Sequence, residues 1–166
     1  MDAMLPARQE FLELARSTLA QFNADFAEFD TPQVMTSARI GIKFTLEDIE
    51  FTLIHSTDPQ IDGLLLVTCT LGRLPLNAEH ETCSRLLAAN YALSSFRLTG
   101  LALDEDENAV YTHSCVMQTW NADGVVALIE AMATLAVRWR DSQLLGIEEF
   151  RPVVEGVRPD AFFALA

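Results

Sequence analysis

The spacing of the apolar residues changes four times along this 166-residue chain, and the order of the changes limits the possible folds. After Pro6 they recur every three or four residues, which is typical of an amphipathic helix over about 6–24. From Ile40 to Phe44, and again from Phe51 to Leu53, they alternate with polar residues, which is typical of strands with one buried face. Later segments repeat both patterns. The spacing therefore predicts a domain that mixes helices and strands.

The whole pattern predicts the order helix, strand, strand, strand, helix, strand, strand, helix. The apolar run Leu64–Leu71 lies between two glycines and suits the centre of the sheet. The remaining predicted elements are a helix from Ala78 to about Ser94, strands near Leu98–Leu103 and Val110–Gln118, and a helix after Asn121. We expect an α+β fold in which helices pack on an antiparallel, twisted sheet.

A chain of this length fits one domain, which we expect over residues 1–145. Glycines and prolines recur after Leu145 and oppose a regular helix, so the extension 146–166 is expected to be extended. Its end is conspicuously apolar, with Phe162, Phe163 and Leu165. Three roles stay open for it: to lie over the sheet in place of a bound partner, to extend a contact between two copies, or to fray.

The charge of the chain excludes some partners. Acidic residues outnumber basic ones by 24 to 11, which gives a net charge of −13. This field repels phosphate groups, so neither nucleic acid nor a membrane is an expected partner. The first residues do not resemble a secretory signal, and no apolar run reaches the roughly 18–20 residues that cross a bilayer. We therefore expect a soluble, cytoplasmic protein.

Cysteine and histidine side chains are the best candidates for chemistry, but their spacing gives little support. His113 and Cys115 share one strand face, and His80 and Cys83 lie three residues apart in a helix, yet no Cys-x-x-Cys pair occurs. A cysteine nucleophile also needs an orienting third group. No glycine-rich phosphate loop is present. We expect no enzyme, no metal and no cofactor, and a thiol or metal enzyme is the third hypothesis in order of preference.

Three sequence strings carry a family resemblance. They are Leu-Leu-Ala-Ala-Asn at 86–90, Gly-Leu-Ala-Leu-Asp at 100–104 before an acidic turn, and the apolar stretch 128–139, which closes in Ala-Val-Arg-Trp-Arg at 136–140. In this order and spacing they resemble the class I type III secretion chaperones, the Tir chaperone (CesT-like) family. The resemblance covers most of 6–144 and fails in the tail, because the family commonly ends soon after its last helix.

The resemblance implies a cytoplasmic bacterial homodimer with a role in virulence. Such a protein binds the N-terminal segment of one or more secreted effectors and keeps it non-globular and competent for secretion, without ATP. The export ATPase of the secretion system is a further candidate partner. The alternative is a protein-binding adaptor or regulator of related fold outside secretion, which would bind a folded partner.

The resemblance also implies two contact regions on an otherwise solvated domain, where a free sheet edge and nearby apolar side chains can receive an extended peptide. Cargo would lie over the first helix and the early strands, matched here by Leu12, Leu19, Phe22, Ile42, Phe44, Phe51 and Leu53. Dimerisation would use the second helix and the later strands, matched here by Leu86, Asn90, Leu93, Leu101 and Leu103.

Overall fold

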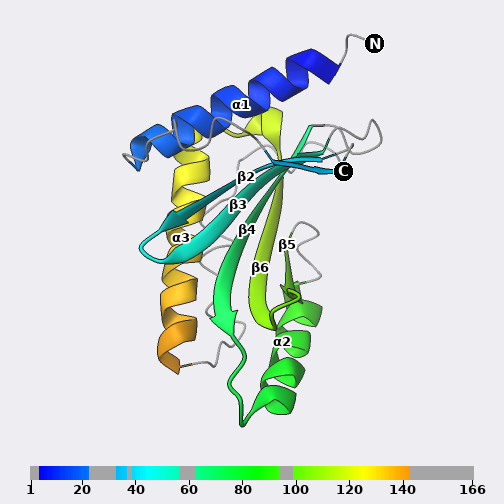
Figure 1. The fold of residues 1–166 in the computed structure, drawn as a ribbon, viewed down its shortest axis with the longest axis vertical. Helices are drawn as coiled ribbons and strands as arrows, with labels where there is room; N and C mark the ends of the chain where they lie inside the picture. The colour runs from blue at the N-terminus through cyan, green and yellow to red at the C-terminus, as the bar shows by residue number, and fades with distance from the viewer. Residues whose placement is uncertain (1–3, 23–32, 37–38, 57–62, 94–98, 143–166) are drawn as a thin grey trace.

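The computed structural model describes residues 4–22, 33–36, 39–56, 63–93 and 99–142 (Figure 1). Its helices are α1 (Met4–Gln21), α2 (Glu79–Leu93) and α3 (Ala122–Ser142), with a short 3-10 turn at Met117–Thr119. Its strands are β1 (Gln33–Thr36), β2 (Arg39–Leu46), β3 (Ile49–Ser56), β4 (Leu64–Arg73), β5 (Thr99–Leu103) and β6 (Asn108–Val116). The predicted order is confirmed, and β1 is an additional strand. The predicted extension 146–166 lies outside the described residues.

The strands form one antiparallel sheet in the order β1-β2-β3-β4-β6-β5. The apolar strand β4 lies between β3 and β6, as the sequence predicts, and β1 and β5 form the two edges. Strands β2 and β3 form a hairpin in which Phe44 faces Phe51. Glu47 and Asp48 complete its tight turn with φ angles of 48° and 63°. We call this end of the sheet the hairpin end.

Helices α1 and α3 cover one side of the sheet, which we call the inner face (Figure 1). The Phe11 ring on α1 stacks on His55 of β3, with ring centroids 5.5 Å apart. On α3, the carbonyl of Met132 accepts a hydrogen bond from Cys69 Sγ at 3.7 Å. Alternation along the strands directs their larger apolar side chains to this side, so most of the core lies here. We call the opposite side the outer face.

Polar contacts set the direction of α3 along the sheet. Asn121 begins the helix, because its Oδ1 accepts a hydrogen bond from the Gly124 N–H at 2.9 Å. At the other end, Arg140 Nη2 donates to the Asp48 carbonyl at 2.6 Å. Helix α3 therefore ends at the hairpin end of the sheet. Within the described ranges, no helix is both long and apolar enough to span a membrane.

Candidate functional site

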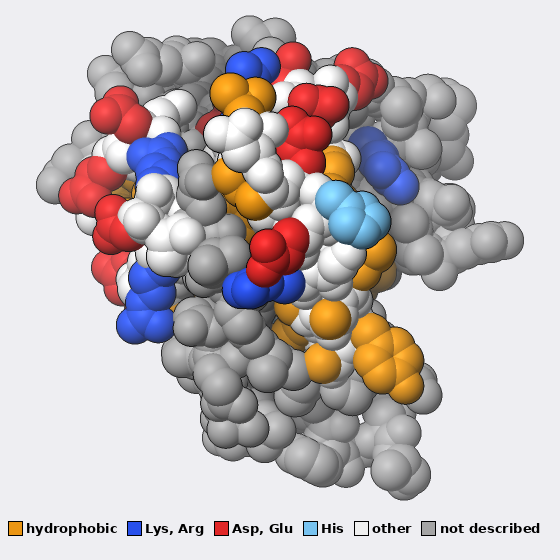
Figure 2. Space-filling view, turned by 90° about the horizontal axis from the view of Figure 1, so that it is seen from below, with side chains coloured by type: hydrophobic (Ala, Val, Ile, Leu, Met, Phe, Trp, Pro, Cys, Tyr) orange, Lys and Arg blue, Asp and Glu red, His pale blue; other side chains and the backbone are white. Residues whose placement is uncertain are grey.

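Exposed apolar side chains gather on and near α2. On this helix Leu87 and Tyr91 are 69% and 85% exposed. Leu76, just before α2, is 83% exposed, and Leu103 at the end of β5 is 46% exposed. Hydrophobic side chains lie beside charged ones on this lower face of the molecule (Figure 2). We call these four residues the α2 patch. Leu87 and Tyr91 lie one turn apart on α2, and neighbouring exposed apolar side chains are typical of a protein-binding surface.

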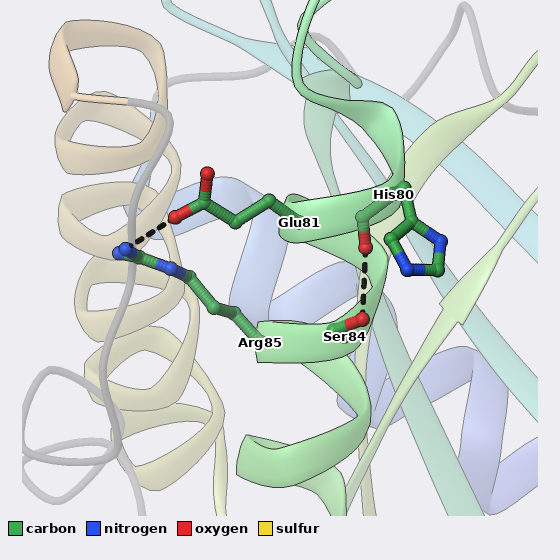
Figure 3. Close-up of polar contacts among 4 residues, drawn as sticks. All are labelled: His80, Glu81, Ser84 and Arg85. Atoms are coloured by element: carbon green, nitrogen blue, oxygen red, sulfur yellow. Dashed lines mark hydrogen bonds and ion pairs between the residues drawn. The ribbon is translucent and has the colours of Figure 1, made fainter.

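The exposed stripe of α2 is polar in the first half of the helix and apolar in the second half. His80 and Ser84 precede Leu87 and Tyr91 on the same stripe of the helix, because the four residues are spaced by three or four. Ser84 Oγ donates to the His80 carbonyl at 2.9 Å, and a Glu81–Arg85 ion pair of 2.7 Å lies on another side of the helix (Figure 3). Exposed pairs of this kind contribute a few tenths of a kcal/mol. These polar groups therefore border the α2 patch and add little to stability.

The structure changes the set of residues available for dimerisation. Leu86 and Leu93 are 7% and 1% exposed and belong to the core, and Leu101 is half-buried against it. Of the five predicted residues, Leu103 offers the most exposed apolar side chain. Leu87 and Tyr91 are exposed on the opposite side of α2 and are not among the predicted residues. The sequence signal for such exposed side chains is that the second half of this helix has apolar residues all round.

Asn90, another dimer candidate, binds the edge of the sheet within the same chain. Its Nδ2 donates to the Leu101 carbonyl at 3.2 Å, and its Oδ1 accepts from the Leu101 N–H at 3.1 Å. The side-chain amide therefore takes the place of a neighbouring strand at the centre of β5. Gly100 makes room, because a Cβ there would lie 3.2 Å from Thr112 Oγ1 and 3.8 Å from Asn90 Oδ1. Asn90 thus blocks strand pairing at this edge.

We expect Asn90→Ala to lower the free energy of unfolding by about 1–3 kcal/mol, because both Leu101 backbone groups lose their partner. Urea unfolding measures the loss. Ser84→Ala is the matched control on the same helix, since it removes one exposed hydrogen bond and should change stability by less than about 0.5 kcal/mol. Equal stability of the two variants would show that the Asn90 contacts add nothing.

The structure also changes the cargo candidates. Five of the seven have almost no exposed surface, between 0% and 3%: Leu19, Ile42, Phe44, Phe51 and Leu53. Four of them lie on strands beneath α1 and α3, and Leu19 lies on α1 itself. They therefore stabilise the domain and have no exposed surface that a cargo could contact. Leu12 and Phe22 are half-buried and pack at the margin of the core. Only these two stay candidates for direct cargo contact.

The cysteines differ in accessibility. Burial raises the pKa of the Cys69 and Cys115 thiols to about 12, so both are protonated at neutral pH and unsuited to nucleophilic attack. Cys115 Sγ donates to the Leu65 carbonyl at 3.6 Å. Cys83 is half-buried on α2. No three His, Cys, Asp or Glu side chains converge as a metal site within the described ranges.

His113 is buried in the core and makes stability depend on pH. It is 7% exposed, its ring lies 5.9 Å from that of Trp120, and burial lowers its pKa from 6.5 to about 4. In the unfolded chain it takes up a proton below about pH 6.5, whereas in the folded chain it stays neutral until about pH 4. Its contribution is therefore complete above pH 6.5 and is lost as the pH falls toward 4.

Because of this residue, we expect the free energy of unfolding to fall by roughly 2–3 kcal/mol between pH 7 and about pH 4.5. Urea unfolding of the original chain and of His113→Phe at both pH values measures it. The variant keeps a ring beside Trp120 but cannot titrate, so its pH dependence should be weaker by that amount. Parallel pH profiles would contradict the prediction.

Comparison with known proteins supports the fold. No family model matches the sequence, and no curated protein matches it. A chain of the HopA1–SchA chaperone–effector complex matches with a TM-score of 0.54 and 15% identity, over 80% of this chain and 94% of its own. A chain of the heterodimeric ExoU–SpcU complex of the Pseudomonas aeruginosa type III secretion system matches with a TM-score of 0.41 and 18% identity, over 84% and 97%. The protein thus has the secretion-chaperone-like α+β fold that its sequence predicts.

Proposed function

We propose that this protein is a secretion chaperone that binds the extended N-terminal segment of a secreted effector in the bacterial cytoplasm. One observation carries the proposal: the fold extends over most of the chain that it matches in a chaperone–effector complex. The role needs a binding surface and no chemistry, so the chaperone holds its cargo non-globular without ATP. The acidic surface keeps the chaperone soluble while apolar side chains hold the cargo.

The cargo site uses the margin of the core. Strand β1 is the edge next to β2, and a cargo segment can pair with it as an added strand. Leu12 and Phe22, half-buried on and just after α1, offer apolar contact to cargo side chains. An extended segment loses conformational entropy when it binds, so its affinity stays modest for its contact area. Modest affinity suits a cargo that must be released for export.

The working form is a homodimer built on the α2 patch. A symmetric dimer uses the same surface on both copies, and the exposed Leu87 and Tyr91 suit such a self-complementary contact. Asn90 closes the adjacent strand edge, so the dimer forms through side chains and not through a continuous sheet.

The experiment that tests the function is a pull-down of the tagged, full-length chain from a native cell lysate. Light scattering gives the mass of the eluted complex, and limited proteolysis maps the protected part of the partner. Two copies of this chain that protect the N-terminal segment of one larger protein would support the chaperone. A monomer, or a dimer bound only to a folded partner, would contradict it and favour an adaptor or regulator outside secretion.

A further inference from the structure

The outer face of the sheet changes in character along its length. Near the hairpin end it carries the ion pair Lys43–Glu50, with 2.7 Å between Nζ and Oε1. The row that contains Lys43 is polar across the sheet, with Thr52, Thr68 and Thr112 in register. The far end carries four apolar side chains, Ile54 beside Leu66 and Leu64 beside Val116, with Ser114 next to Leu66 and Arg39 in β2.

The four apolar side chains at this end form what we call the outer apolar end. All are half-buried, and none carries a charge in a chain with a net charge of −13. Among the described elements, α1 and α3 pack on the inner face and α2 contacts β5. The first residue of β5, Thr99, pairs with His113, so the described pairing of β5 with β6 does not reach Ser114 or Val116. No described helix or strand therefore covers the outer apolar end.

We propose that residues 161–166 dock on the outer apolar end of their own protomer. The first argument is composition. After Ser142, every charged side chain lies before Ala161, and the final segment Ala-Phe-Phe-Ala-Leu-Ala is uncharged. Phe162, Phe163 and Leu165 supply the apolar surface that Ile54, Leu64, Leu66 and Val116 would bury.

The second argument is reach. Helix α3 ends at the hairpin end, and residues 143–166 follow it. An extended chain of this length spans up to about 80 Å, whereas β4, which runs the length of the sheet, is about 33 Å long. The segment can therefore pass around the sheet and place its charged part over the polar rows and its apolar end over the apolar rows.

The third argument is charge. Arg39 is exposed, and it lies four residues from Lys43 in β2, so both side chains lie on the outer face. It lies opposite Ser56, at the same end of the sheet as the outer apolar end. Asp160, just before the apolar segment, supplies a carboxylate that can pair with this guanidinium. Apolar packing beside a charge pair favours this segment over a second copy of the domain, whose contact we assign to the α2 patch.

Paramagnetic NMR of the cargo-free, full-length protein tests the proposal independently of the chaperone function. A spin label is attached at Ala164→Cys in a Cys83→Ser background, since Cys69 and Cys115 are buried. We expect loss of the methyl resonances of Ile54, Leu64, Leu66 and Val116. The Val110 methyls, on the outer face near the hairpin end, should lose less intensity. The double variant Phe162→Asp, Phe163→Asp leaves the described domain intact and should restore the lost resonances.

Three results would overturn the proposal. Uniform or absent signal loss would show that the tail does not dock and that the face is left for a partner. Loss centred on α1 or on the α2 patch would place the tail elsewhere. Loss that appears only between spin-labelled and isotope-labelled chains mixed together would show that the tail docks on a second copy.

Discussion

Tyr91→Asp is expected to convert the proposed dimer into a folded monomer. Tyr91 is the most exposed of the large apolar side chains in the described ranges and belongs to the α2 patch, on which the proposed symmetric contact is built. The substitution removes a ring that the contact would bury and places a carboxylate there without a partner. Because both copies carry it, we expect the dimer to weaken by about a thousandfold or more, which is roughly 4 kcal/mol. Sedimentation equilibrium measures the dissociation constant.

Two comparisons make the result specific. Val137→Asp is the matched control, since Val137 is 45% exposed on α3 and is not part of the α2 patch, so this variant should leave the proposed dimer intact. Leu93→Asp is a different case, because its side chain is 1% exposed and the charge would unfold the domain. If the dimer persists in both Tyr91→Asp and Leu87→Asp, its interface does not include α2.

Most of the fold can be predicted from the spacing of apolar residues. Three helices and five strands occur in the predicted order because each has an apolar face with its own period. Strand β1 is different. Gln33–Thr36 has four residues, too few for a clear alternation, and its pairing with β2 is irregular between Val34 and Thr36. Pairing with β2, the next strand along the chain, and not its own pattern, makes it a strand.

The candidate site is less predictable, since a buried core and a binding surface have the same composition. Ile42 and Phe44 alternate as a half-buried strand should, but the pattern cannot tell whether cargo or a helix covers them. In the structure α1 and α3 cover that face. On α2 the helical period places Leu86 and Leu93 on one side of the helix. They are buried because α2 packs against β5.

Phe51→Ala has the largest expected effect on stability and separates the two interpretations of the early strands. The side chain is 0% exposed, and its ring stacks on Phe44 with centroids 5.5 Å apart. Removing a buried ring leaves a cavity, so we expect the free energy of unfolding to fall by about 3–5 kcal/mol. This is a large part of the roughly 5–15 kcal/mol that stabilises a typical domain. Urea unfolding measures it directly.

The matched variant is Leu12→Ala, which changes a half-buried side chain at the margin of the core. It should cost about 1 kcal/mol of stability and weaken cargo binding, because Leu12 keeps exposed surface. Cargo affinity, counted per folded molecule, should be nearly unchanged in Phe51→Ala, since that ring contacts only the interior. The opposite result, a stable Phe51→Ala that no longer binds cargo, would mean that the face under α1 and α3 opens to receive the effector.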